Sequence, residues 1–180
     1  MILENNLATI NIKLDDTYSV NSTDNNSKYD IEHNLLKYVD RDNYYCVLSI
    51  NIELSNNECK KIALIGDKYS YAEDCAILDN NILNILQNKL IIQLDINTGN
   101  ILRTIKLNNS WINFGILKYK ENYIIYGEIE ITMLNREFEE KWRHNCPDIL
   151  KDIKINDDRI HLYYFEGDYE ELDYGGNKIN

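Results

Sequence analysis

Carboxylate side chains crowd two short stretches in the last quarter of the chain. The first stretch contains Glu137, Glu139 and Glu140. The second contains Glu166, Asp168, Glu170, Glu171 and Asp173, with Tyr169 among them. Paired carboxylates can hydrolyse glycosides or hold calcium, but this sequence lacks the regular Asp-x-Asp-x-Asp calcium loop and its closing Glu.

Two interpretations of these stretches remain. The charges can keep exposed sheet edges soluble, or they can form an acidic docking face in which tyrosine supplies an interface anchor. On the second interpretation the predicted binding residues are Glu137, Glu139, Glu140, Glu166, Asp168, Tyr169, Glu170 and Glu171.

Histidine and cysteine give no sign of a reactive site. The histidines are His33, His144 and His161, and no Gly-x-Ser-x-Gly elbow accompanies them. His144 and Cys146 stand two positions apart, but no second ligand pair is nearby in the sequence. No glycine-rich loop fits a phosphate. We therefore expect no enzyme, no catalytic residue, no metal and no cofactor.

The four cysteines point to a reducing compartment. None of Cys46, Cys59, Cys75 and Cys146 forms a Cys-x-x-Cys pair, and we expect them to be buried free thiols. The first ten residues show no basic region followed by an apolar stretch. The expected location is the cytoplasm.

Composition limits the class of partner. The chain has 180 residues, 44% of them hydrophobic, and a formal net charge of −11. These values are typical of one globular domain, here 1–180. Nucleic acid or an anionic membrane would require a cationic face, so we exclude both as partners.

A strand–turn unit recurs about every forty residues and must position the acidic stretches. Leu14, Leu54, Leu94, Leu134 and Leu172 recur at intervals of 40, 40, 40 and 38 residues. From Cys75 onward each of these leucines follows an upstream hairpin, which gives four short strands per unit. Four antiparallel strands joined by polar turns are typical of a propeller blade. We predict an all-β meander of three to four propeller-like blades, as a partial or small β-propeller.

The N-terminal part, 1–73, is less regular than the repeats over 74–180. Within 29–39, Ile31, Leu35, Leu36 and Val39 follow helical spacing, and Asp30 could cap an N-terminus. This spacing predicts one short helix there.

The stretch 94–102, Leu-Asp-Ile-Asn-Thr-Gly-Asn-Ile-Leu, resembles the hairpin of quinoprotein-like propeller repeats. The run from about 74 to 180 is similar to a family of small, uncharacterised acidic bacterial proteins. The matching segments are Asn113–Gly115, Tyr126–Ile131, Glu140–Trp142 and Glu171–Asn177. The resemblance implies a propeller-like fold and no activity.

These observations favour a non-enzymatic protein-binding module. A concrete version is an immunity or antitoxin-like protein whose acidic face covers a basic toxin, because a negative partner is steered to a cationic cleft. The alternatives are a propeller-type scaffold and a carbohydrate-binding domain that uses the C-terminal hairpin. The sequence leaves the oligomeric state open.

Overall fold

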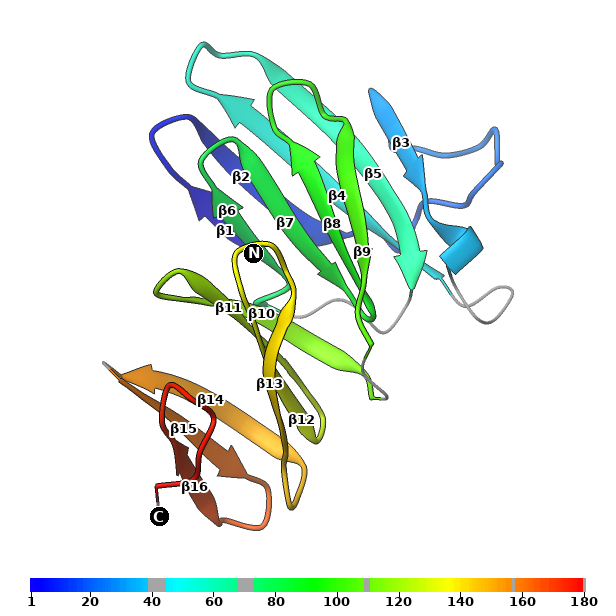
Figure 1. Cartoon of the computed structure of the whole chain (residues 1–180). Helices are drawn as coiled ribbons and strands as arrows, with labels where there is room; N and C mark the ends of the chain where they lie inside the picture. The colour runs from blue at the N-terminus through cyan, green and yellow to red at the C-terminus, as the bar shows by residue number, and fades with distance from the viewer. Residues whose placement is uncertain (39–44, 68–72, 109–110, 157, 180) are drawn as a thin grey trace. The chain divides into compact units, whose positions relative to one another are not determined.

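The computed structural model describes residues 1–38, 45–67, 73–108, 111–156 and 158–179, most of them in β-strands (Figure 1). The chain divides into two compact units, Met1–Asn108 and Asn109–Asn180, and each is described by itself. The organisation of 1–180 as a single domain stays a prediction.

The first unit contains a five-stranded sheet whose strand order is β1-β2-β4-β5-β3. Its strands are β1 (Ile2–Glu4), β2 (Ala8–Leu14), β3 (Ile31–Asn34), β4 (Tyr45–Leu54) and β5 (Cys59–Asp67). Neighbouring strands are antiparallel except β3, which runs parallel to β5. Alternate residues of β2, such as Ile10 and Ile12, are fully buried, as expected when one face of a sheet meets the core.

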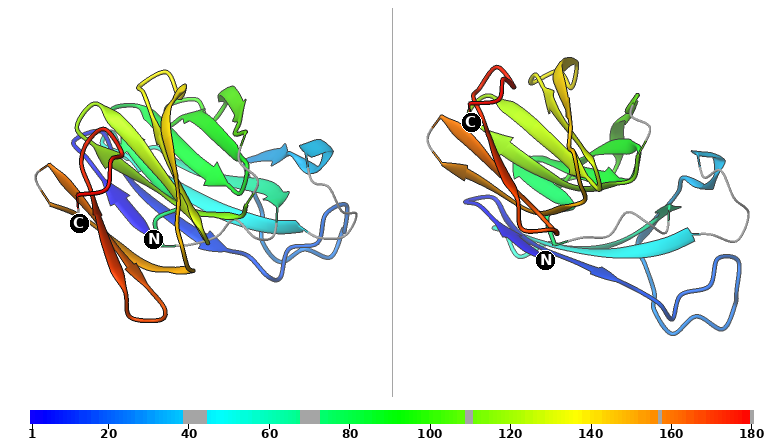
Figure 2. Two further views of the ribbon diagram at one scale, coloured as in Figure 1. Left: turned by 60° about the horizontal axis from the view of Figure 1, so that its bottom comes forward. Right: turned by 90° about the horizontal axis from the view of Figure 1, so that it is seen from below.

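The second sheet of this unit is an antiparallel meander of four consecutive strands. They are β6 (Ala76–Asp79), β7 (Ile82–Gln87), β8 (Leu90–Asp95) and β9 (Ile101–Lys106). Side chains from both sheets form one core, which joins Ile10 and Ile50 to Ile85 and Ile92. Figure 2 shows the blue-to-cyan strands and the green strands as separate layers.

The second unit also has two antiparallel sheets. One contains β10 (Asn113–Tyr119), β11 (Asn122–Gly127), β12 (Glu130–Leu134) and β13 (Glu140–Asn145). The other contains β14 (Leu150–Asn156), β15 (Arg159–Tyr164) and β16 (Tyr169–Leu172). A shared core that includes Ile124, Ile131, Leu162 and Leu172 holds them together.

The predicted fold class is confirmed, because the chain is all-β and builds successive small antiparallel sheets of propeller type. Leu94, Leu134 and Leu172 each lie on the third strand of a sheet, on β8, β12 and β16. A register shift falls at Gln93/Leu94 and again at Met133/Leu134, so the repeat extends to local geometry. Leu14 and Leu54 instead end neighbouring strands of one sheet, so they do not mark two further blades.

The short helix expected within 29–39 is present only as a 3₁₀ turn near the end of that range, and the start of the range is a strand. Ile31–Asn34 form strand β3, and only a single 3₁₀ turn follows at Leu36–Tyr38; residue 39 lies outside the described residues. Asp30 caps no helix, because its Oδ2 accepts the backbone N–H of Lys61 at 2.7 Å. His33 Nε2 lies 2.7 Å from the carbonyl oxygen of Gly99, which further ties this segment to the sheets. Long-range pairing thus overrides the local helical spacing.

The outer face of the five-stranded sheet is partly covered. Val47, Ala63 and Ile65 form a small second core with Tyr18 and Tyr29, which come from the segment between β2 and β3. The Tyr29 hydroxyl donates to Asp15 Oδ2 at 2.6 Å, which fixes the ring over the sheet.

The cysteines are free, and three of the four are buried. Burial raises the pKa of Cys46 to about 12 and that of Cys146 to about 11. Cys59 is exposed, so the expectation of burial is wrong for this residue, which begins β5 beside a turn. Among the described residues, no helix has the length and apolar character needed to cross a bilayer.

Candidate functional site

The first acidic stretch lies in the turn that joins β12 to β13. Glu137 and Glu139 are exposed, and the Asn135 Oδ1 atom accepts both of their backbone N–H groups, at 3.0 and 2.8 Å. Asn135 Nδ2 also donates to Glu139 Oε2 at 3.0 Å. Glu140 begins β13, where Arg143 Nη2 lies 2.6 Å from its Oε2. Of the three carboxylates, Glu140 is therefore already neutralised by a cation.

The second acidic stretch forms the turn between β15 and β16. Glu166 and Asp168 are exposed there, and Gly167 between them has a positive φ of 97°. The backbone N–H of Glu166 donates to Asp148 Oδ2 at 3.2 Å, which brings a third carboxylate to the turn. The backbone N–H of Tyr164 donates to the carbonyl of Asp168 at 3.0 Å and closes the turn.

Large apolar side chains project to solvent at the same turn. Phe165 is 66% exposed, Tyr169 is 54% exposed and Ile149 is 41% exposed. The Phe165 N–H donates to the carbonyl of Ile149 at 3.1 Å, so these two residues are neighbours. The Tyr169 ring stacks on Tyr163 with ring centres 6.4 Å apart. We name residues 148, 149 and 165–169 together the acidic–aromatic turn.

Glu170 differs from its neighbours, because its side chain is buried within the second unit. The residue is 8% exposed, and its carboxylate makes three polar contacts. Lys178 Nζ donates to Oε1 at 2.6 Å, the Tyr164 hydroxyl donates to Oε2 at 2.7 Å, and His144 Nε2 lies 3.0 Å from Oε2. Burial by itself would raise the pKa of Glu170, but the hydrogen bonds from Lys178, Tyr164 and His144 outweigh it and lower the pKa.

This buried cluster is suited to joining structural elements. His144 comes from β13, Tyr164 from β15 and Lys178 from the C-terminal segment, so one carboxylate ties both sheets and the end of the chain together. Burial raises the pKa values of Tyr164 and Cys146, which keeps both protonated at neutral pH. A protonated thiol is a poor nucleophile, so the arrangement favours hydrogen bonding over covalent chemistry.

Glu171 points away from this cluster and pairs with other groups. Arg159 Nη1 lies 2.8 Å from its Oε2, and His161 Nδ1 lies 3.4 Å from its Oε1. The Glu171 side chain is only 16% exposed, so it supports the hairpin more than it adds free negative charge.

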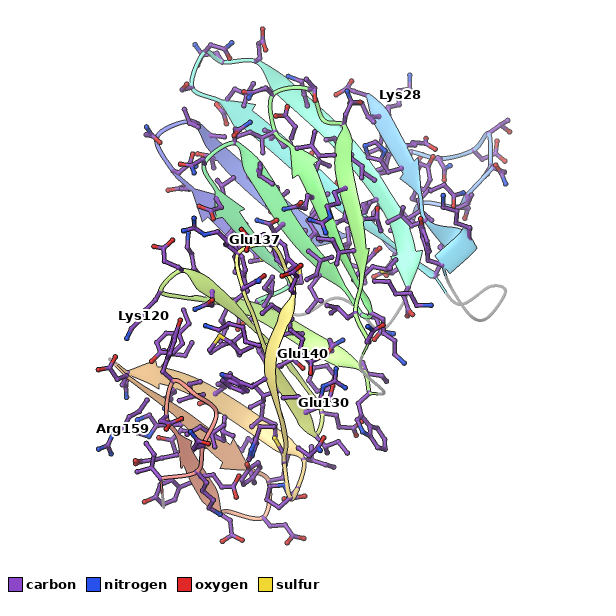
Figure 3. The ribbon with its side chains drawn as sticks, in the orientation of Figure 1. Lys28, Lys120, Glu130, Glu137, Glu140 and Arg159 are labelled. Carbon is purple, nitrogen blue, oxygen red and sulfur yellow. The ribbon has the colours of Figure 1, made fainter. Side chains whose placement is uncertain are left out.

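The structure does not bring the eight predicted residues onto one face. The turn with Glu137 and Glu139 follows the end of β12 at Leu134, whereas the acidic–aromatic turn adjoins 148–150, beyond the other end of β13. Figure 3 places Glu137 and Glu130 at opposite ends of the β12–β13 hairpin. Glu166, Asp168 and Tyr169 form one site, Glu137 and Glu139 a second, and Glu170 is internal.

The sequence analysis did not identify the apolar side chains of the acidic–aromatic turn or the hydrogen-bond partners of Glu170. Phe165 and Ile149 lie at the ends of the two runs that flank the turn at 156–158, and they were not considered as part of a binding surface. The alternation of β15, with Ile160, Leu162 and Tyr164 inward, could have placed Phe165 beyond the strand. Over the described parts of the chain, no group of three or more His, Cys, Asp or Glu residues is placed to hold a metal ion.

No family model matches the sequence, and no curated protein is similar to it. Solved structures are similar in fold. BamB from Moraxella catarrhalis is 11% identical, with 76% of this chain and 46% of that chain covered and a TM-score of 0.49. A protein of unknown function from Bacteroides caccae is 11% identical, with 75% and 61% covered and a TM-score of 0.48.

The computationally designed Ika8 protein is also 11% identical, with 78% of this chain and 46% of that chain covered and a TM-score of 0.52. The chain therefore spans about half to three fifths of the length of these proteins. At 11% identity the likeness concerns the fold alone. The chain is thus similar in fold to the designed Ika8 protein, and its own architecture is all-β and propeller-like.

Proposed function

We propose that this protein is a non-enzymatic binding module that docks on a basic surface of another protein through the acidic–aromatic turn. The observation that carries the proposal is the 66% exposure of Phe165 beside the carboxylates of Glu166 and Asp168. A concrete partner is a basic toxin, with this chain as its immunity or antitoxin-like protein.

Two physical effects support docking at this turn. A large aromatic ring releases much apolar surface from water when a partner pocket covers it, which makes aromatic residues common centres of interface energy. Carboxylates around the ring act at longer range, because a negative field speeds the approach of a cationic partner. The net charge of −11 adds to that field.

The turn is also held in shape before any partner arrives. The Asp148 carboxylate and the Ile149 carbonyl accept backbone N–H groups of Glu166 and Phe165, and Tyr163 supports the Tyr169 ring. A preformed surface loses less conformational entropy on binding than a disordered one. The site can therefore bind with little rearrangement.

The test compares four baits in pull-downs from the native cell. They are the unchanged protein, Phe165→Ala, and the pair Glu166→Gln with Asp168→Asn. The fourth bait carries the pair Glu137→Gln with Glu139→Gln and is a control, because these residues lie in the β12–β13 turn, outside the acidic–aromatic turn. All changed side chains are exposed, so each bait should fold, which circular dichroism checks. Retained proteins are identified by mass spectrometry.

We expect a basic protein that is retained by the unchanged bait and by the Glu137/Glu139 control. It should be lost from the Phe165→Ala bait and weakened with the Glu166/Asp168 pair. The affinity of that protein for the unchanged chain should fall as salt increases. Equal retention by all four baits, or no binding at low salt, would disprove the proposal.

A propeller-like scaffold without one dedicated partner is the second candidate. The fold-level likeness to the designed Ika8 protein favours it, because a propeller-like frame can exist without a natural ligand site. Size-exclusion chromatography of the protein from its native cell separates the two. A species with no co-purifying basic protein supports the scaffold, and a stable complex supports docking.

A further inference from the structure

The first unit carries a groove on the outer face of its five-stranded sheet, independent of the acidic–aromatic turn. Its volume is about 410 Å³, and it is lined by residues of β1, β2, β4 and β5 together with Asp30. This is the face opposite the buried Ile10 and Ile50. The groove lies next to the part of the face that Tyr18 and Tyr29 cover.

The strand register arranges the lining residues in two parallel rows. One row crosses the four strands through Glu4, Thr9, Glu53 and Cys59. The second row crosses the same strands through Ile2, Asn11, Asn51 and Lys61. Neighbouring strands lie about 4.8 Å apart, so each row presents one functional group per strand at regular spacing. The result is a regular array of acceptors and donors along the groove, which we name the platform.

Asparagine is unusual at the positions that Asn11 and Asn51 occupy. Both stand inside long strands and directly face each other, although Asn is depleted in strands. Several asparagines elsewhere in this unit have a local structural task. For example, Asn5 Oδ1 accepts the N–H of Leu7, and Asn25 Nδ2 donates to the carbonyl of Ser19.

Five polar side chains of the groove have no structural task of this kind. Within the described parts of the chain, the side chains of Glu4, Thr9, Asn11, Asn51 and Glu53 make no hydrogen bond or ion pair. Their hydrogen-bonding capacity is directed to solvent in the groove. A ligand there can replace water with fixed partners.

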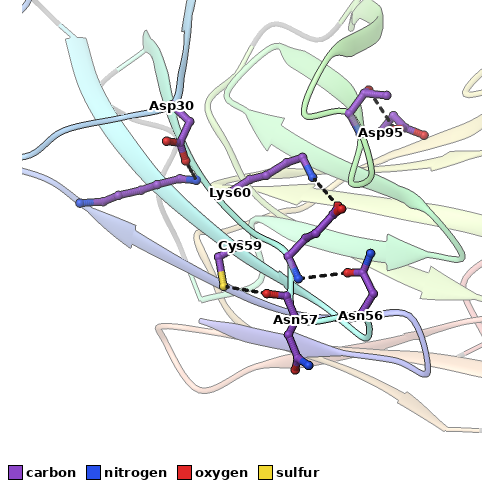
Figure 4. A network of polar contacts seen from close by, with 9 residues as sticks. Asp30, Asn56, Asn57, Cys59, Lys60 and Asp95 are labelled. Carbon is purple, nitrogen blue, oxygen red and sulfur yellow. Dashed lines mark hydrogen bonds and ion pairs between the residues drawn. The ribbon is translucent and has the colours of Figure 1, made fainter.

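One wall of the groove is firmly positioned. The Asp30 N–H donates to the carbonyl of Lys61 at 2.8 Å, while Asp30 Oδ2 accepts the N–H of Lys61 at 2.7 Å. The Lys61 ammonium lies 5.0 Å from the centre of the Tyr29 ring. Figure 4 shows Asp30 with Cys59 and Lys60, whose ammonium lies 3.6 Å from Glu58 Oε2.

The chemistry of the lining favours an uncharged ligand. The carboxylates of Glu4, Glu53 and Asp30 are nearly balanced by the ammonium groups of Lys60 and Lys61, so the lining carries both signs and little net charge to attract an ion of either sign. A peptide recognised by its main chain needs a free strand edge, but β2, β4 and β5 already pair on both sides, and the edge strand β1 has only three residues. Carboxylates, amides and an ammonium together match a ligand that both donates and accepts hydrogen bonds.

An apolar group completes the pattern. Ile2 is 65% exposed at the end of the Asn11 row, and it offers an aliphatic surface beside the polar groups. A ligand with hydroxyl groups on its edges and C–H groups on its face satisfies both kinds of contact. We propose that this groove binds an uncharged oligosaccharide, through Asn11, Asn51 and the carboxylates of the neighbouring row.

The test begins with an array of neutral, acidic and amino oligosaccharides, followed by titration calorimetry with the strongest neutral probe. Asn11→Val and Asn51→Val remove the amides and place a strand-favouring residue at each position. Lys13→Val is the matched control, because Lys13 lies exposed on the same strand and face but outside the groove. Phe165→Ala checks the second unit.

We expect binding of a neutral oligosaccharide that each Asn variant weakens by roughly fivefold to tenfold, the value of one lost hydrogen bond. Lys13→Val and Phe165→Ala should bind as the unchanged protein does. The melting temperatures of the Asn variants should stay level or rise, which separates lost binding from lost folding. A silent array, binding of charged glycans only, unchanged affinity in both Asn variants, or loss of binding in Phe165→Ala would each overturn the proposal.

Discussion

Glu166 and Glu170 lie four residues apart in the same hairpin, yet their carboxylates have opposite surroundings. Glu166 faces solvent at the turn, whereas Glu170 lies on β16 among Lys178, Tyr164 and His144. The hydrogen bonds that Glu170 accepts compensate for its removal from water. At the scale of single residues, Glu170 therefore acts as a structural cross-link and Glu166 as surface charge.

Glu170→Gln should destabilise the protein by about 2 kcal/mol, because hydrogen bonds to a charged acceptor are among the stronger ones. In glutamine one of the two carboxylate oxygens becomes an NH₂ group, which cannot accept a hydrogen bond. Either the contact with Lys178 or the contacts with Tyr164 and His144 are therefore lost. Chemical denaturation followed by circular dichroism measures the free energy of unfolding. Glu166→Gln is the control and should change it by less than about 0.5 kcal/mol. Equal effects of the two variants would contradict the assigned role.

The pH dependence of stability should also identify Glu170. Its folded pKa is lowered, as is that of Asp95, where burial is outweighed by hydrogen bonds from Thr98 and Asn81. A lowered pKa contributes stability that is present above the unfolded value of about 4 and is lost as pH falls through the folded value. Unfolding midpoints should be level near pH 6 and fall below about pH 4. The decline should be shallower in Glu170→Gln, and an equally steep decline would argue against Glu170.

Local sequence could not separate these two carboxylates. Both occur in one run of acids and aromatics, and the difference arises from His144 and Lys178, which come from a different sheet and from the chain end. The acidic turn residues Glu166 and Asp168 were predictable, because turn and charge signals are local. The alternation of β15 places Phe165 outward, but the large exposed fraction of its ring was not predictable, because it depends on which residues pack over the end of β15.

Among the structural elements, the turn after the third strand of each of the three meander sheets follows one plan. An Asp or Asn begins it, and a residue with positive φ ends it: Gly99, Phe138 and Gly176. Phe138 takes the left-handed conformation that glycine adopts in the other two turns, with φ of 65°. Its ring is buried and stacks on Tyr123 at 4.5 Å. Packing of the ring therefore offsets the backbone strain.

The conflict between ring packing and backbone strain at Phe138 predicts that a glycine variant is more stable than an alanine variant, the reverse of the usual order. Both Phe138→Gly and Phe138→Ala lose the buried ring and should destabilise the protein by roughly 2–4 kcal/mol. Only glycine relieves the left-handed backbone, so Phe138→Gly should be more stable than Phe138→Ala by about 1 kcal/mol. Thermal denaturation of both variants provides the measurement. Greater stability of the alanine variant would show that the turn is not strained.

The hairpins of β6–β9, β10–β13 and β14–β16 were predictable, because each strand pairs with the next one along the chain and its turns carry Asn, Asp or Gly. The pairing of strands in the five-stranded sheet was not predictable from the sequence. β2 pairs with β4 across thirty residues, and β3 runs parallel to β5, and neither pairing leaves a local signal. The same long-range pairing explains why the helical spacing from Ile31 onward gave the wrong element.

At the scale of the whole molecule, each unit has a core of its own. One core draws on Ile50, Leu64 and Ile92, and the other draws on Ile131, Leu162 and Tyr164. We expect each core to open as its own cooperative unit. Hydrogen exchange read by mass spectrometry should show that Glu170→Gln lowers protection in peptides of 109–180 and leaves those of 1–108 unchanged. Lower protection throughout the chain would show that the two units unfold together.

The exposure of Cys59 has a practical consequence. It is the one exposed thiol of the four, whereas burial holds the pKa of Cys46 near 12 and that of Cys146 near 11. A maleimide dye should therefore attach at this single position without any engineered cysteine. Because Cys59 lines the groove, the emission of the attached fluorophore would report directly on what enters it.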